Sequence, residues 1–324
     1  MRSDTNPVVS NAALVLVVAV TALVASGCKP DVGEPPSLVH GPRLLAIRQT
    51  PPEVMPGAPT QFAALVVDVG GTLPTGIAWS ICNTPKSPSE SNSVSQACVT
   101  QPDDDVAHVE PVDLTMPADA CSLFGPDPPP VTPPIRPRDP DLTGGFFVPV
   151  RASAATPDGA TLLAFAFERV RCNLANAPGD VVRAYNMAYV PNQNPIIADV
   201  VLDPDGAAPT SLLTGEGAAV VASASRVTLR AVWAAEAAES YPLYDPPTRS
   251  LVNPREALGA SWFATDGAFE HDRTGRGGDE PETFTDDEWS APTVTAPTAV
   301  HVWVVLRDER GGVDFAAFDL TVVP

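Results

Sequence analysis

The strongest strand signal in the chain is residues 298–323, TAVHVWVVLRDERGGVDFAAFDLTVV. Every second residue of its first half is apolar, which places on one face of a strand Val300, Val302, Val304 and Leu306. The second half alternates in the same way, with the apolar set Ala316, Phe318, Leu320 and Val322. Gly311 and Gly312 separate the halves and supply the backbone freedom of a turn. The stretch therefore predicts a β-hairpin with His301 on the face turned to solvent.

Similar strand and turn signals occur upstream in two groups, which predict one domain over 43–190 and another over 195–324. Proline and glycine number 38 and 22 of 324 residues, which disfavours long helices and favours strands joined by turns. The clearest strands are GIAWSIC (76–82), GGFFVPVRASAAT (144–156), ATLLAFAFERVRC (160–172), PIIADVVLDPDG (195–206) and SRVTLRAVWA (225–234). Residues 83–145 are polar and proline-rich, and we expect an extended insertion there.

Residues 258–323 contain a tryptophan strand, SWFATDGAF, the segment WSAPT and the turn LRDERGG. With these motifs the region resembles the bacterial immunoglobulin-like and PKD-like modules. In the first group AWSIC is similar to the same tryptophan strand, although long insertions interrupt the rest of the pattern. The resemblance implies an all-β fold with two immunoglobulin-like β-sandwich domains in tandem. It implies no particular activity, because such sandwiches carry many functions.

The N-terminus has the sequence pattern of an export signal. Residues 12–25, AALVLVVAVTALVA, form an uncharged run of 14 residues, shorter than the about 20 that a membrane-spanning helix needs. Such a length suits the apolar core of a secretory signal. The segment Ala25-Ser26-Gly27-Cys28 resembles a lipobox, where bacterial lipoproteins are diacylated on the cysteine thiol and cleaved just before it, although Ala25 replaces the usual leucine. The alternatives are an ordinary signal peptide and an uncleaved anchor.

The lipobox resemblance implies a signal peptide over 1–27 and a lipid, such as palmitate, on Cys28. Residues 28–42 then form a proline-rich linker, because this stretch has no apolar periodicity and its prolines keep it extended. We therefore expect a protein of the bacterial cell envelope, held by its N-terminal lipid in a membrane, most simply the outer membrane. The leaflet, periplasmic or surface-facing, is left open.

Four further cysteines, Cys82, Cys98, Cys121 and Cys172, remain once Cys28 is lipidated. An even number in an exported chain predicts two disulfides, formed in an oxidising compartment. Three pairings are open, and proximity in sequence favours Cys82 with Cys98 and Cys121 with Cys172. Zinc is disfavoured, because no two of these cysteines have the short spacing of a zinc site.

The net charge and the lack of catalytic motifs argue against two classes of function, nucleic-acid binding and the enzyme classes with well-known sequence motifs. The net charge is -20, from 39 acidic and 19 basic residues, which argues against nucleic acid as a partner because no basic surface is available to neutralise phosphates. The histidines are scattered, and neither a metalloprotease HExxH, a GxSxG elbow nor a P-loop occurs. The sequence therefore favours a protein that is not an enzyme.

One candidate metal site stands in residues 270–288, EHDRTGRGGDEPETFTDDE. Carboxylates on a loop are suitable calcium ligands, and extracellular modules bind Ca²⁺ in this way. The candidates are Asp279, Glu280, Glu282, Asp286 and Asp287, with Glu288 beside them. Their spacing matches no EF-hand, so the alternative is a solvated acidic loop that keeps the domain soluble and needs no cofactor.

A candidate ligand site is the aromatic pair Tyr241 and Tyr244, in the segment SYPLYDPPTRS between two strands of the second domain. An exposed aromatic pair on a loop could bind sugar or peptide. The leading hypothesis is thus a non-enzymatic envelope lipoprotein that binds or scaffolds an envelope protein or polysaccharide. The alternatives are a calcium-dependent adhesin and an envelope hydrolase or carbohydrate-active enzyme that uses loop carboxylates.

Overall fold

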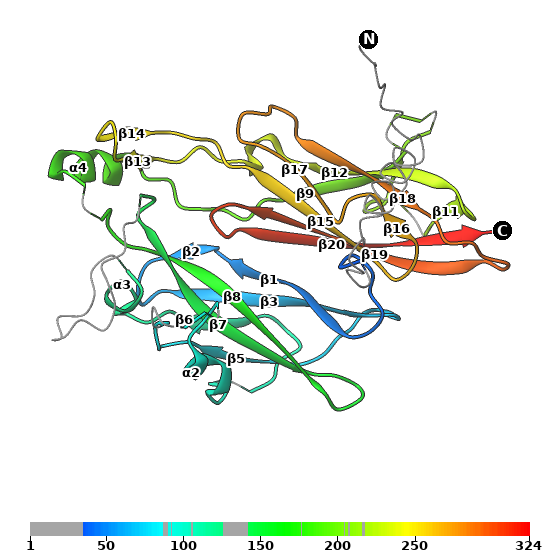
Figure 1. Cartoon of the computed structure of the whole chain (residues 1–324), viewed down its shortest axis with the longest axis horizontal. Helices are drawn as coiled ribbons and strands as arrows, with labels where there is room; N and C mark the ends of the chain where they lie inside the picture. The colour runs from blue at the N-terminus through cyan, green and yellow to red at the C-terminus, as the bar shows by residue number, and fades with distance from the viewer. Residues whose placement is uncertain are drawn as a thin grey trace, which may run out of the picture. The chain divides into compact units, whose positions relative to one another are not determined.

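Two β-sandwiches follow one another along the chain in the computed structural model (Figure 1). The structure describes residues 35–86, 90–91, 93–104, 106–125, 142–175, 177–203, 205–206, 208–215 and 218–324. The predicted signal peptide, Cys28 and the proline-rich run 126–140 lie outside the described residues. Within the described residues, no helix combines the length and the apolar character needed to cross a membrane. The all-β fold predicted from the sequence is confirmed.

The first sandwich consists of two sheets. One contains the strands β1 (Arg43–Thr50), β3 (Pro59–Asp68), β4 (Gly71–Thr72) and β6 (Val112–Thr115). The other has the order β2 (Glu53–Val54), β8 (Thr161–Arg171), β7 (Gly145–Ala155) and β5 (Ile77–Ile81). Among the described residues, the short helices α2 (Gln96–Thr100) and α3 (Ala120–Leu123) accompany these sheets. The helix α4 (Gly179–Ala188) follows β8 in the chain and lies beside β14 (Ser250–Val252) (Figure 1). The segment 83–145 is therefore more than an insertion, since β6 within it pairs with β3.

The second sandwich also has two main sheets. One runs β10 (Thr210–Ser211), β9 (Ile197–Leu202), β12 (Arg226–Trp233), β18 (Phe284–Ser290) and β16 (Ala268–Phe269). The other, called sheet A below, runs β11 (Ala219–Ala222), β20 (Val313–Val323), β19 (Thr298–Asp308), β15 (Leu258–Ala264) and β17 (Arg273–Arg276). A 3-10 turn (Ala235–Ala237) and a small hairpin of β13 (Leu243–Asp245) and β14 (Ser250–Val252) connect β12 to β15.

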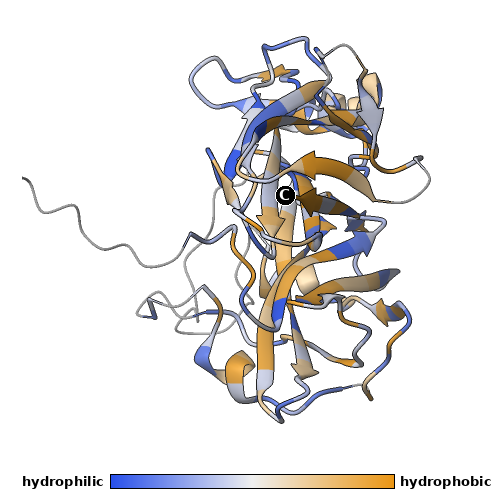
Figure 2. Ribbon diagram, turned by 90° about the vertical axis from the view of Figure 1, so that its right-hand side faces the viewer, coloured by the Kyte–Doolittle hydropathy of each residue, from blue (hydrophilic) through white to orange (hydrophobic). Residues whose placement is uncertain are grey.

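Each sandwich has its own apolar core. The first core gathers Phe62, Trp79, Val148, Val150 and their neighbours from both sheets. The second gathers residues of both sheets, and its β19 face is the alternating set predicted from the sequence, each 0% exposed: Val300, Val302, Val304 and Leu306. Figure 2 shows hydrophobic residues along the strands and hydrophilic residues in many connecting loops. Gly311, with φ of 105°, provides the left-handed turn between β19 and β20.

A third apolar cluster joins the two sandwiches. Trp303 and Val305, on the opposite face of β19, are buried against Leu45 and Val67 of the first sandwich. The neighbouring His301 is partly covered as well, and its Nδ1 lies 2.7 Å from Oδ1 of Asp319. The prediction that this face is open to solvent is therefore corrected, because the first sandwich packs on it. Residues Pro36–Pro324 accordingly form one compact unit.

Candidate functional site

The four cysteines are paired as proximity in sequence predicts. Cys82 bonds to Cys98, with Cα atoms 5.4 Å apart, and Cys121 bonds to Cys172, with Cα atoms 5.7 Å apart. The first bridge fixes the segment around α2 beside β5, and the second ties α3 to the end of β8. Both bridges therefore hold the segment between β5 and β7 against the first sandwich.

The predicted ligand pair Tyr241 and Tyr244 is buried, and the expectation of an exposed aromatic pair is corrected. Tyr241 donates its hydroxyl hydrogen to Oε1 of Glu309 at 2.7 Å, and the Arg310 guanidinium carbon lies 4.6 Å from the centre of its ring. Tyr244 packs with Leu174 and Tyr185 in a small apolar cluster. Both rings therefore stabilise the fold.

The predicted calcium ligands are spread over separate places. Asp279 and Glu280 lie in the turn after β17, and Oε2 of Glu280 accepts a hydrogen bond from the Gly277 amide. Asp286 accepts two hydrogen bonds from Arg230. The carboxyl of Asp287 is buried in β18, whereas Glu282 is exposed. In the described part of the chain, no three His, Cys, Asp or Glu side chains are grouped so that they could hold a metal ion.

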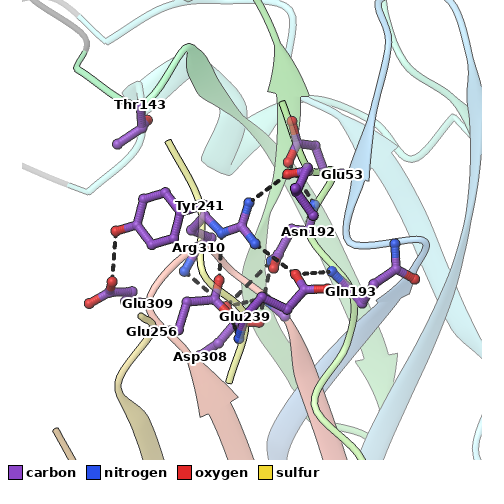
Figure 3. A network of polar contacts seen from close by, with 12 residues as sticks. Glu53, Thr143, Asn192, Gln193, Glu239, Tyr241, Glu256, Asp308, Glu309 and Arg310 are labelled. Atoms are coloured by element: carbon purple, nitrogen blue, oxygen red, sulfur yellow. Dashed lines mark hydrogen bonds and ion pairs between the residues drawn. The ribbon is translucent and has the colours of Figure 1, made fainter. Parts of the chain in front are cut away.

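A polar network lies where the connector between α4 and β9 meets both sandwiches (Figure 3). Its centre is Arg310, 2% exposed, in the turn between β19 and β20. The Arg310 guanidinium forms ion pairs with Glu256 and, at 2.7 Å, with Glu239, and it donates a hydrogen bond to the Val190 carbonyl. Three hydrogen-bonding directions of one guanidinium thus join three segments that are distant in sequence.

The connector itself is bonded to both sides. The amide of Asn192 donates to Oε2 of Glu53 at 3.0 Å, while its side-chain amide donates to the Asp308 carboxylate at 3.3 Å. Glu53 also forms a buried ion pair with Arg169 at 3.3 Å. The connector is thus bonded to Glu53 of the first sandwich and to Asp308 and Arg310 of the second. These bonds orient the two sandwiches relative to each other. This joint was not predicted from the sequence, since its members are isolated polar residues in unrelated segments.

Burial governs the protonation of this region. It raises the pKa of Glu256 to about 7, with the Asp308 carboxylate adding to the effect. It also raises the pKa of Asp308 and Glu239 above the ordinary range. Glu256 is 1% exposed, so a substrate cannot reach its carboxyl without opening the joint. The arrangement therefore performs a structural task, the joining of the sandwiches.

Glu168, on the inner face of β8, is the most perturbed acid. It is 0% exposed, and both carboxyl oxygens lack a hydrogen-bond partner. Burial, followed by the nearby Glu53, raises the pKa of Glu168 to about 9. The side chain is therefore protonated at neutral pH, because the charged form would be costly without solvent.

A groove lies between the edges of the two sheets of the first sandwich. Its volume is about 310 Å³, and its walls come from β1, β8 and the turn after β19, including Leu44, Ile47, Ala164, Phe167, Arg307 and Gly311. Phe147, on β7, and Phe167 stand at its rim and are 39% and 38% exposed. The same two rings also line a second hollow of about 490 Å³ beside α2. The groove is thus continuous with an exposed aromatic surface.

One wall of this groove is a free strand edge. β8 pairs with β7 along its whole length, but β2 pairs only with Arg169 and Val170. The Cys172 amide donates to Gly144, and hydrogen-bonded pairs alternate along an antiparallel ladder. The even-numbered residues of β8 therefore face β7, and the backbone groups of Leu163 and Phe165 face outward. The outward carbonyl of Phe167 lies beside Gly311 of the turn after β19. No strand among the described residues pairs with this part of the edge.

Comparisons with known proteins add no identification. No protein-family model and no curated protein matches this sequence. The adhesin InvE of Yersinia pseudotuberculosis aligns over 89% of this chain and 61% of its own length, with 8% identity and a TM-score of 0.22. Dimeric latent PorU of Porphyromonas gingivalis aligns over 88% of this chain and 24% of its own, with 12% identity and a TM-score of 0.20. TM-scores this low support no argument about function.

Proposed function

We propose that this protein is a lipid-anchored, exported binding module of the bacterial cell envelope, without enzymatic activity, and that it binds an extended segment of an envelope protein along the free edge of β8. The observation that carries the binding proposal is the groove between β1 and β8. The lipobox-like segment ending at Cys28 and the two disulfides support the export and the anchor.

Strand addition explains the features of the groove together. An unpaired strand edge offers a row of amides and carbonyls at the spacing of a second strand, so an incoming peptide gains main-chain hydrogen bonds. Its alternate side chains point to opposite faces. One set would meet the apolar groove lined by Ala164 and Ile47, and the other would meet the half-exposed rings of Phe147 and Phe167.

A polypeptide fits this edge better than a polysaccharide does. Sugar sites combine aromatic platforms with several polar side chains that fix the hydroxyl groups. The described lining of the groove contains only Gln49 and Arg307 as polar side chains, and Arg307 already donates to the Leu45 carbonyl. Most of the hydrogen-bond donors and acceptors available to a ligand in the groove are therefore backbone amides and carbonyls of the β8 edge. The backbone of a peptide can pair with them.

The anchor is tested on the full-length protein in its own cell. Mass spectrometry of the mature N-terminus should find diacylglycerol on Cys28, and fractionation should place the protein in the membrane. Cys28→Ala should move it to the soluble exported fraction, whereas Lys29→Ala should leave it in the membrane. Unmodified Cys28 in mature protein, or membrane retention of Cys28→Ala, would contradict the anchor.

The binding site is tested with linear peptides selected from a random display library on the full folded chain. Upon binding, the amides of Leu163 and Phe165 should become protected from hydrogen exchange. The amides of Ala164 and Ala166 should be protected both before and after binding, because they already face β7.

Variants of β8 then separate edge pairing from general loss of structure. Leu163→Pro removes an outward-facing amide, which a strand edge tolerates, and should weaken the selected peptide about tenfold or more. Leu163→Ala keeps the amide and should bind within about threefold of the parent. Equal affinity of the Pro and Ala variants, with melting curves unchanged, would rule out strand addition, as would selected peptides that protect residues elsewhere.

A further inference from the structure

Two arginines that have no acidic partner among the described residues lie on one face of sheet A. Arg307 of β19 is opposite Gly259 of β15, and Arg273 of β17 is opposite Ser261 of the same strand. Residues paired in this way point to the same face of a sheet, so the two arginines flank β15 from either side. Gly259 has no side chain and open space above it. The four residues therefore outline a trough.

The trough is a recess at the edge of the contact between the sandwiches. It has a volume of about 340 Å³, and its lining includes Gly259, Ser261, Arg273 and Arg307. Arg307 is partly buried and donates to the Leu45 carbonyl at 3.0 Å and weakly to the Ser261 hydroxyl at 3.5 Å. Arg273 is exposed. Neither guanidinium forms an ion pair with a carboxylate among the described residues.

Single arginines such as Arg43 and Arg255 also donate to backbone carbonyls instead of carboxylates. What distinguishes the trough is that two such arginines lie near each other in an acidic chain. With 39 acidic and 19 basic residues, carboxylates are in excess, and other arginines of the structure, such as Arg48, Arg230 and Arg310, have acidic partners. Burial and the neighbouring Arg273 lower the pKa of Arg307. Two cations are thus held near each other at a cost in free energy that an anion would offset.

The two acids that also line the recess are already engaged. The Asp308 carboxylate accepts hydrogen bonds from the amides of Arg310 and Gly312, and from the side chain of Asn192. The Glu309 carboxylate accepts the hydroxyl hydrogen of Tyr241. Both carboxylates are therefore bound within the joint, and the donors that remain for a ligand belong to Arg273, Arg307 and Ser261.

We propose that this trough binds a compact oxyanion, the phosphate or carboxylate group of a ligand, between the guanidinium groups of Arg273 and Arg307, with the Ser261 hydroxyl as a further donor. Guanidinium groups bind such groups with two parallel hydrogen bonds, and the open floor at Gly259 admits the anion. Arg307 also lines the groove beside β8, but the anion donors of the trough do not include the β8 edge, and the site does not depend on peptide binding there.

The site is tested by titrating inorganic phosphate, and separately citrate, into the folded full chain at constant ionic strength set with NaCl. Saturable binding of either anion is expected, with a rise in melting temperature over chloride alone. Arg273→Gln should weaken the anion about tenfold, and Ser261→Ala should weaken it by a smaller factor. Arg273 is exposed and repels Arg307, so its substitution should not lower the melting temperature measured without anion.

Arg183→Gln provides the matched control, because it removes the same charge from an exposed position on α4. It should leave the affinity for phosphate or citrate unchanged. The proposal is overturned if neither anion binds above the chloride background. It is also overturned if Arg273→Gln and Arg183→Gln weaken binding equally, since the effect would then be one of net charge.

Discussion

The indole Nε1 of Trp303 donates a hydrogen bond of 3.1 Å to Oγ1 of Thr72. Trp303 belongs to the last hairpin of the chain and Thr72 to the short strand β4 of the first sandwich, so the bond crosses between the sandwiches. Trp303 is 1% exposed and packs beside Leu45, Val67 and Val305. A single side chain thus contributes both apolar burial and a directional bond to the contact.

Replacing Trp303 should separate these two contributions. Trp303→Ala removes a large buried side chain and should lower the free energy of unfolding by about 3–5 kcal/mol. Trp303→Phe retains most of the apolar contact but loses the bond to Thr72. The lost hydrogen bond and the smaller ring together should lower the free energy of unfolding of Trp303→Phe by about 1–2 kcal/mol. Urea denaturation measures both, and an equal loss for the two variants would contradict the assigned packing role.

Glu168 should make stability fall as pH rises. Below the ordinary glutamate value of 4.5, folded and unfolded chains both carry the proton. Between 4.5 and about 9 the unfolded chain loses it while the folded chain keeps it. The contribution of Glu168 to the free energy of unfolding should therefore decrease by up to about 1.4 kcal/mol per pH unit over this window.

Glu168→Gln tests this dependence because glutamine does not titrate. The free energy of unfolding of this variant should match that of the parent near pH 5. Near pH 8 it should exceed that of the parent by on the order of a few kcal/mol. Glu236→Gln, at an exposed position, should reproduce the pH profile of the parent. A Glu168→Gln variant whose stability declines with pH as steeply as the parent would show that the carboxyl is not buried in its protonated form.

The joint around Arg310 should be sensitive to the loss of one partner. Arg310→Met leaves the buried carboxyl of Glu256 without its cation and should cost about 3–5 kcal/mol of stability near pH 8. The double variant Arg310→Met, Glu256→Met should recover part of that loss, because the uncompensated charge is gone. Denaturation of the single and double variants gives the coupling energy, and purely additive losses would argue against a direct pair.

The two disulfides should contribute unequally. Cys121–Cys172 closes 51 positions of chain and Cys82–Cys98 closes 16. A longer closed loop restricts the unfolded chain more. Replacing Cys121 and Cys172 by serine should therefore lower the free energy of unfolding by about 1 kcal/mol more than replacing Cys82 and Cys98. Urea denaturation of both double variants tests this, and peptide mapping without reductant checks the pairing. A larger cost for the shorter loop would contradict the expected order.

Several elements were predicted from local pattern alone. The closing hairpin, the strands that carry Trp79 and Trp262, and the pairing of the cysteines all agree with the structure. The strand β6 was missed because four residues, VDLT, carry too little alternation to be recognised. The predicted exposure of Tyr241 and Tyr244 was wrong, because a segment rich in turn residues was taken to be open, whereas Glu309, Arg310 and α4 cover it.

By itself, the sequence determined most of the longer strands and which face of them is apolar, because alternation along a strand is a local property of the chain. Only the tertiary structure decided what lies on the opposite faces. Trp303 is buried, Arg307 and Arg273 share a trough, and the edge of β8 is left unpaired. Each of these results depends on contacts or pairings between segments far apart in the chain, which follow from how the sheets stack and not from any one segment.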